Sequence, residues 1–199
     1  MATAPVLIEA TIRHQVLLEQ LKTGEAEKIA KYLREIDKVV RDRLSRDDLT
    51  GWGRDRLEKM LAEIDGQILA IYARYSRELN SDLVDIAEYE AAFETRSLDQ
   101  VLVNYSTVAP TLPALRAAIK ARPLQVQGAG GGKLLEPFLE DWTSAERGRV
   151  INAVRLGFSQ GLTNFQIIQS IRGTKAANYS DGILAINSRN ADAIVRTAV

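Results

Sequence analysis

Apolar residues recur at intervals of three and four along most of this chain, which is the spacing of an amphipathic helix. The clearest stripe lies within residues 25–44, where lysines and arginines occupy many of the remaining positions. We therefore predict a helix over residues 25–44 that buries one face and keeps its charged face in solvent. The stripe consists of Ile29, Leu33, Ile36, Val40 and Leu44.

A second stripe predicts a long helix over residues 54–79, after a turn at 45–53 that is rich in Ser, Asp, Thr and Gly. A helix of this length needs a partner along its apolar face. The simplest partner is residues 25–44 in the antiparallel sense, which gives a helical hairpin of the bundle type. The stripe consists of Leu57, Leu61, Ile64, Ile68, Ile71 and Tyr75.

Shorter helices are predicted on either side of this hairpin. Residues 6–22 have helical spacing, which Gly24 interrupts. Asn80 with Ser81 predicts a break or kink before a further helix over 82–95. That last helix carries a small acidic patch, which either faces solvent or meets a basic partner. The patch consists of Asp82, Asp85, Glu88, Glu90 and Glu94.

The middle of the chain is less regular. Residues 98–106 fit a short helix or a strand, and Pro113 is placed to begin a helix that continues to Lys120. Pro123 ends that helix, and the glycine-rich residues 125–133 follow as a linker.

The glycine-rich segment does not match a phosphate-binding loop. Such a loop needs Gly, four residues and then Gly-Lys-Ser/Thr. Gly132 and Lys133 are present, but Gln127 stands at the first glycine position and Leu134 at the Ser/Thr position. We therefore expect a hinge and no nucleotide site.

The last third of the chain predicts a series of short capped helices. A short helix over 134–142 precedes Thr143 and Glu146, whose spacing is that of a capping box. These two residues are therefore expected to begin a new helix that runs to Gln160, where Gly161 would follow as its C′ residue.

A second capping box is predicted at Thr163 and Gln166, beginning a helix that Gly173 ends. A loop is expected over residues 176–187, and a last helix from near Ser188 that is still running at Val199.

The pattern as a whole predicts an all-α protein. We expect a helical bundle-like region over residues 1–122, a Pro/Gly-rich linker over 123–133, and a unit of short capped helices over 134–199. Because no helix-ending residue precedes Val199, we expect the third unit to be truncated at its C-terminal end.

Composition excludes several kinds of chemistry. The chain has no cysteine and one histidine, His14, so neither a thiolate site nor a histidine-based triad can be assembled within it. No carboxylate pair stands out as catalytic, and we expect neither an enzyme nor a cofactor. The N-terminus lacks the features of a signal peptide, no apolar run is long enough to span a membrane, and we expect a soluble protein.

The charge balance bears on nucleic-acid binding. Lys and Arg together number 26, as do Asp and Glu, whereas duplex-DNA binders usually carry a basic excess. Residues 149–172 nevertheless resemble a helix-turn-helix. A nucleic-acid or partner contact there would use Arg147, Arg149, Arg155 and Arg172.

Residues 134–199 resemble the phage head morphogenesis family, the minor head proteins similar to the F protein of phage Mu. The resemblance lies in the order of three segments. A helix over 149–157 leads to a Gly161-Leu-Thr corner with an Ile-rich helix, and a final helix contains Ala191-Asp-Ala-Ile-Val-Arg-Thr. Family members often have an acidic residue after this Arg-Thr, where this chain has Ala198.

The resemblance implies a low-copy structural protein of a tailed bacteriophage. It would act in head assembly near the portal or inside the capsid, with ejection alongside the genome as a further implication. Its partners would be the portal or major capsid protein in a symmetric assembly, with at most a weak non-specific contact to DNA. The alternative is a nucleic-acid-binding or DNA-packaging-associated module that uses the 149–172 corner, and a third reading is an enzyme whose active domain follows Val199.

Overall fold

The computed structural model describes residues 4–46, 53–102, 106–124 and 132–198, and it is all-α, as the sequence predicts. Six helices lie within these ranges and no strand does. They are α1 (Ala4–Leu44), α2 (Arg54–Val101), α3 (Leu112–Ala121), α4 (Leu135–Ser159), α5 (Asn164–Arg172) and α6 (Ile183–Ala198).

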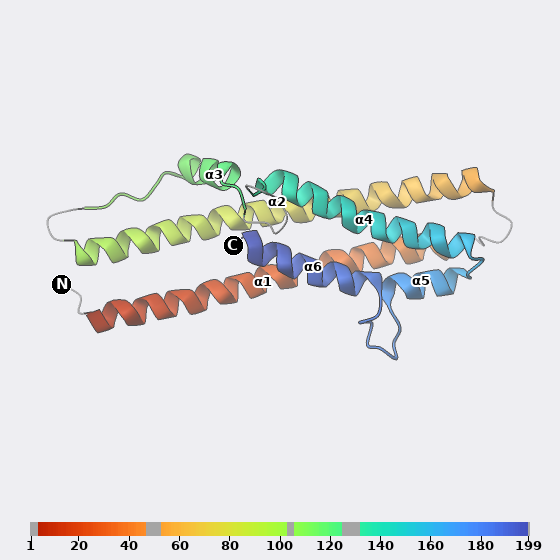
Figure 1. Ribbon diagram of the computed structural model, residues 1–199, viewed down its shortest axis with the longest axis horizontal. Helices are drawn as coiled ribbons and strands as arrows, with labels where there is room; N and C mark the ends of the chain where they lie inside the picture. Colours follow the sequence, from red (N-terminus) through yellow and green to blue (C-terminus); the bar gives the residue numbers. More distant parts are fainter. Residues whose placement is uncertain (1–3, 47–52, 103–105, 125–131, 199) are drawn as a thin grey trace.

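The two longest helices, α1 and α2, lie side by side as an antiparallel hairpin (Figure 1). Their facing stripes are the ones the sequence predicts, and Ile36, Leu44, Ile64 and Ile68 are fully buried there. Burial of such side chains stabilises the hairpin by about 1.5–3 kcal/mol each.

The predicted helix breaks at Gly24 and at Asn80 are wrong, because each helix continues through that residue. Gly24 lies within α1, and a glycine in a helix costs only about 1 kcal/mol relative to Ala, which the apolar contacts of a long helix offset. Asn80 lies within α2, where its Nδ2 donates to the carbonyl oxygen of Ser76 at 2.9 Å. Because the buried stripe of α2 continues through Leu79 to Leu83, tertiary packing overrides the local preference for a break.

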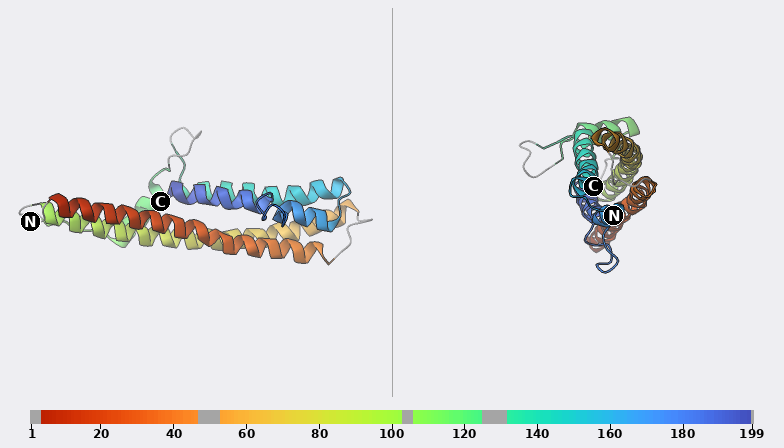
Figure 2. Two further views of the ribbon diagram at one scale, coloured as in Figure 1. Left: turned by 90° about the horizontal axis from the view of Figure 1, so that it is seen from below. Right: turned by 90° about the vertical axis from the view of Figure 1, so that its right-hand side faces the viewer.

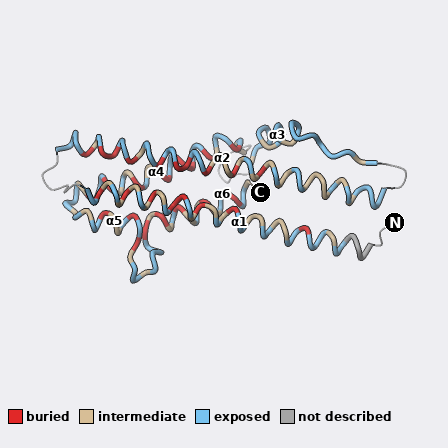
Figure 3. Tube along the Cα trace, turned by 180° about the vertical axis from the view of Figure 1, so that it is seen from behind, coloured by how far each residue is buried: buried red, intermediate tan, exposed pale blue. Residues whose placement is uncertain are grey.

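The C-terminal helices form a second layer over one part of this hairpin (Figure 2). Helix α4 packs on α2, α6 packs on α1, and α5 contacts both α1 and α4. The buried residues concentrate where the two layers overlap (Figure 3), and those of α4, α5 and α6 join those of α1 and α2 in one hydrophobic cluster.

The predicted division of residues 134–160 into two helices is wrong, because α4 is continuous from Leu135 to Ser159. Thr143 does not cap a helix; its Oγ1 donates to the carbonyl oxygen of Glu140 at 3.1 Å. Glu146, the expected second member of the capping box, is buried. The final helix also begins earlier than predicted, at Ile183.

The corner between α4 and α5 is built as predicted. Gly161 follows the helix with φ of 69°, a left-handed value that glycine adopts without strain. Thr163 accepts from the backbone N–H of Gln166, and the Gln166 side chain accepts from the backbone N–H of Thr163, which completes the capping box. Gly173, with φ of 94°, ends α5.

The segment between α3 and α4 is anchored at its two ends. Leu124 and Lys133 form an antiparallel bridge, with N···O distances of 2.8 and 3.1 Å. Helix α3 begins with Pro113 in its first turn, as predicted. The glycine-rich linker between Leu124 and Gly132 lies outside the described residues.

Candidate interaction surface at the α4–α5 corner

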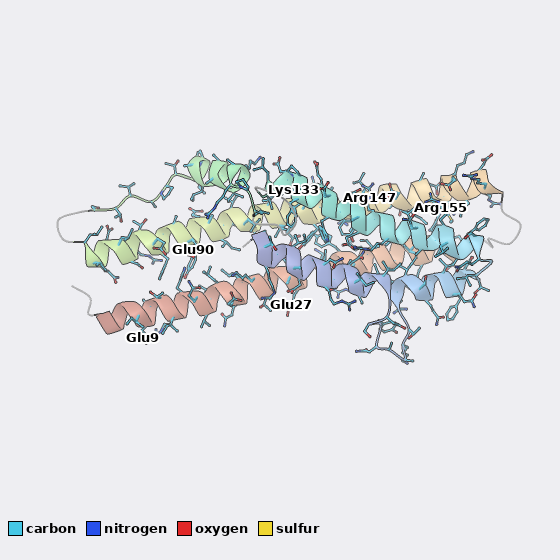
Figure 4. The ribbon with its side chains drawn as sticks, in the orientation of Figure 1. Glu9, Glu27, Glu90, Lys133, Arg147 and Arg155 are labelled. Atoms are coloured by element: carbon cyan, nitrogen blue, oxygen red, sulfur yellow. The ribbon has the colours of Figure 1, made fainter. Side chains whose placement is uncertain are left out.

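The four arginines for which the sequence predicts a nucleic-acid or partner contact lie along α4 and at the end of α5. Three of them project from α4 and one from the end of α5, and Figure 4 labels two of these residues along α4. Each of the four has a carboxylate partner within the chain. They are Arg147, Arg149, Arg155 and Arg172.

Two of these ion pairs join α4 to α2. The Nε of Arg147 donates to Asp65 at 2.9 Å. Arg155 makes a two-pronged contact with Glu58, its Nε and Nη2 donating to the two carboxylate oxygens at 3.2 and 3.0 Å. The Arg155 guanidinium lowers the pKa of Glu58, and that carboxylate in turn raises the pKa of Arg155. Both arginines therefore tie the second layer to the hairpin.

The other two arginines pair with carboxylates of α4 and α1. Arg149 donates to Glu146 one turn earlier on α4. The guanidinium of Arg172 lies 3.8 Å from Asp37 of α1 and 4.6 Å from the ring centre of Tyr179, over its face. A phosphate could engage any of these four guanidinium groups only in competition with a carboxylate that already holds it.

Two large apolar side chains at the α4–α5 corner are exposed to solvent. Leu156, near the end of α4, is 56% exposed, and Phe165, in the first turn of α5, is 67% exposed. Exposed aromatic and aliphatic side chains are typical of a protein-protein contact more than of a phosphate-binding surface. The corner thus presents apolar groups outward while its cations face carboxylates.

Beneath the arginines lies a buried polar cluster that the sequence analysis missed. Glu146 of α4, which is 1% exposed, accepts from Asn190 of α6 at 2.8 Å as well as from Arg149. Asn187 of α6 donates to the hydroxyl of Tyr72 at 3.2 Å. The cluster therefore links α2, α4 and α6.

Aromatic rings border this buried polar cluster. The ring of Trp142 packs edge-on against Tyr72 and Tyr75, with centroid separations of 5.4 and 5.7 Å. Burial raises the pKa of both tyrosine hydroxyls above the ordinary 10.0. Four buried atoms of the cluster have no hydrogen-bond partner among the described residues: Tyr75 Oη, Trp142 Nε1, Glu146 Oε2 and Asn187 Oδ1.

A signal for this cluster is present in the sequence. Glu146 lies four residues after Trp142 and four before Val150, so it occupies a position of the apolar stripe of α4. Asn187 similarly lies between Leu184 and Ala191 on the buried face of α6. A polar residue at a stripe position is the mark of a buried polar group.

Within the described ranges, no three His, Asp or Glu side chains gather closely enough to hold a metal ion. None of the helices in the described part of the chain is both long and apolar enough to cross a membrane.

The chain was also compared with known proteins. It matches no family of known proteins, no curated protein and no solved structure.

Proposed function

We propose that this protein is a non-enzymatic structural protein of a tailed bacteriophage, a minor head protein that acts in head assembly near the portal or the capsid interior. The proposal draws on the resemblance of residues 134–199 to the phage head morphogenesis family. In the folded chain these residues form α4, the Gly161 corner, α5 and α6, which pack as one layer. The protein would be made in the host cytoplasm, enter the virion at low copy in a symmetric assembly, and leave with the genome.

The observation that carries this proposal is the character of the α4–α5 corner. Phe165 and Leu156 are exposed there, while each of the four arginines of α4 and α5 has a carboxylate partner. Such a surface favours a protein partner, which in a phage head is the portal protein or the major capsid protein.

The same observation counts against the alternative, a nucleic-acid-binding or packaging-associated module. Affinity for DNA comes largely from cations that neutralise phosphates. Arg155 and Arg147 would have to exchange Glu58 and Asp65 for phosphates, and this exchange would loosen α4 from α2. Direct DNA binding is therefore the secondary proposal, limited to a weak non-specific contact.

The experiment is a complementation test in the phage that encodes this chain. Deletion is expected to abolish infectious particles, and wild-type protein supplied in trans is expected to restore them and to be found at low copy in purified virions. Phe165→Ser combined with Leu156→Ser is expected to fold but to be missing from the particles. Val108→Ser, at a position that is 90% exposed away from this corner, is the matched control and should be incorporated.

Two results would overturn the proposal. Deletion that leaves particles intact and infectious would exclude an essential head role. Salt-sensitive binding of DNA by the purified protein, weakened by Arg155→Ala but not by Phe165→Ser, would support the nucleic-acid reading instead.

A further inference from the structure

The far end of the α1–α2 hairpin extends past the second layer. The C-terminal end of α6 lies beside the middle of α1, where the guanidinium of Arg196 is 3.8 Å from the carboxylate of Glu19. Before Glu19 the two long helices continue together without α4, α5 or α6 over them (Figures 1 and 2). We call residues 8–18 of α1 with residues 89–101 of α2 the distal hairpin.

One face of α1 in the distal hairpin is apolar and uncovered. Ile8, Ile12 and Val16 are 60%, 59% and 53% exposed, and their spacing of four residues sets them along one side of the helix. Further along the same helix, where α1 packs against α2, α5 and α6, Ile29 and Ile36 are almost completely buried. The stripe differs in being a row of aliphatic side chains that the described helices leave more than half exposed.

This stripe is not the face that holds α1 to α2. That contact is made by His14, whose Nε2 lies 2.5 Å from the carboxylate of Glu90. Its ring stacks on Phe93, with centroids 3.6 Å apart and planes within 2° of parallel. His14 is 4% exposed, so the α1–α2 contact is closed here, and the apolar stripe remains available for another helix.

The charged residues beside the stripe, one acidic and one basic, could pair with those of a second copy of the chain. Glu9 and Arg13 lie along one flank, and an ion pair of 2.5 Å joins them within the helix. If a two-fold axis passes through Ile12, a second α1 runs antiparallel across the first, and Ile8 of each copy meets Val16 of the other. Glu9 then lies about 3 Å along the helix axis from the partner's Arg13, within reach of an ion pair. The same operation forms the reciprocal pair.

We infer that two copies of this chain associate through the Ile8–Ile12–Val16 stripe of α1, antiparallel about a two-fold axis at Ile12. The two α1 helices then pack against each other, and each α2 lies on the opposite side of its own α1, where His14 contacts it. The inference does not depend on the proposed phage function. With three aliphatic residues from each copy at its centre, the dimer is expected to be reversible, with a dissociation constant on the order of micromolar.

The test is the mass of the purified full-length protein in solution, followed by sedimentation equilibrium over a range of concentrations. The wild-type chain is expected to shift from monomer to dimer as its concentration rises. Ile12→Asp is expected to keep it monomeric. Leu69→Asp, an exposed aliphatic position of α2, is the matched control and should dimerise as wild type does. Circular dichroism shows that each variant is folded.

Charge reversal tests the two-fold geometry directly. Glu9→Arg alone sets two cations against each other across the axis, and Arg13→Glu alone sets two anions, so each is expected to weaken dimerisation at least tenfold. Mixing the two single variants restores both ion pairs between unlike chains, so a heterodimer is expected. The double variant Glu9→Arg/Arg13→Glu should also dimerise.

Three outcomes would overturn the inference. The first is a wild-type chain that remains monomeric at high micromolar concentration. The second is a dimer that Ile12→Asp leaves intact, and the third is a mixture of the two single variants that forms no heterodimer, because either of these results would move the contact away from this stripe.

Discussion

Asn187 of α6 donates a hydrogen bond to the hydroxyl of Tyr72 of α2 across 3.2 Å, and both side chains are fully buried. The two residues are 115 positions apart in sequence, so the bond joins the first layer of the fold to the second. A buried polar pair has a directional requirement that apolar packing lacks, so this bond fixes the register of α6 on the hairpin.

Tyr72→Phe is expected to lower the free energy of unfolding by about 1–3 kcal/mol, because the Asn187 amide loses its acceptor and stays buried. Asn187→Leu is expected to cost a similar amount, since it leaves the Tyr72 hydroxyl unpaired. Chemical denaturation of both single variants and of the double variant measures the coupling. The double variant should cost less than the sum of the two by about 1 kcal/mol. Strict additivity would show that the bond contributes nothing.

Gly157 leaves no room for a side chain at the contact of α4 with α5. A Cβ built there would lie 2.5 Å from Cγ1 of Ile167, which is fully buried. Gly157→Ala is therefore expected to lower the free energy of unfolding by about 1–3 kcal/mol through overpacking. Thermal unfolding followed by circular dichroism measures the change.

Gly148→Ala is the matched control on the same helix. Nothing lies within 4 Å of a Cβ at that position. Alanine is favoured over glycine within a helix, so this substitution is expected to stabilise by about 0.5–1 kcal/mol. Equal effects of the two substitutions would contradict the packing of α5 on Gly157.

Glu25 is expected to make the stability of the fold depend on pH. Burial raises its pKa above the ordinary 4.5, nearby Asp82 raises it further, and the ion pair with Lys28 opposes both. The folded protein therefore binds a proton at Glu25 more readily than the unfolded chain does. This contribution to stability is fully present below pH 4.5 and is lost as the pH rises through the raised pKa of the folded state.

Glu25→Gln, which is neutral at every pH, should remove this dependence and raise the free energy of unfolding at pH 7. Lys28 keeps a carboxylate partner in the variant, because Asp82 lies 2.7 Å from its Nζ. Denaturation curves at several pH values between 4 and 7 test the prediction. Glu27→Gln, an exposed position of the same helix, is the control and should leave the dependence in place. If the free energy of unfolding of Glu25→Gln depended on pH as that of the wild type does, other groups would be responsible for the dependence.

Tyr32 is expected to ionise late in an alkaline titration. Its hydroxyl donates to Glu78 of α2, and this hydrogen bond, with burial, raises its pKa from 10.0 to about 12. The interaction contributes stability below pH 10 that is lost as the pH rises towards about 12. Tyrosinate absorbance measures the transition, and Tyr32→Phe should delete one ionisation in this range. A titration in which Tyr32→Phe removes an ionisation near pH 10 would contradict the hydrogen bond to Glu78.

The parts of the fold that the sequence predicts well are those set by local chemistry. Apolar spacing defines the hairpin stripes, and the Thr163 capping box needs only Gln166 three residues away. At Thr143 the same local signal predicts a helix start that does not occur. Trp142 and Val150 are buried on either side of it, and their packing stabilises a continuous α4. Gly24 likewise does not interrupt its helix, because the long-range packing of α1 outweighs the low helix propensity of glycine.

The candidate surface could be predicted only in part. Sequence identifies the four arginines, but their carboxylate partners lie up to 135 residues away, as Arg172 does from Asp37 at 3.8 Å. Such pairings depend on how α4 and α5 dock on the hairpin. The exposure of Phe165 could not be predicted either, since its neighbours Ile167 and Ile168 follow the same apolar run.

Because α1 and α2 are antiparallel, the contacts between them differ in how much chain separates the two residues. Arg43 and Glu63 meet across 20 residues of chain, whereas His14 and Glu90 meet across 76. The entropic cost of closing a loop grows with its length, so we expect the contacts near Arg43 to form first and those near His14 to form last. Backbone amides there should exchange with solvent deuterium earliest within the hairpin, and their protection reports directly on whatever covers that end.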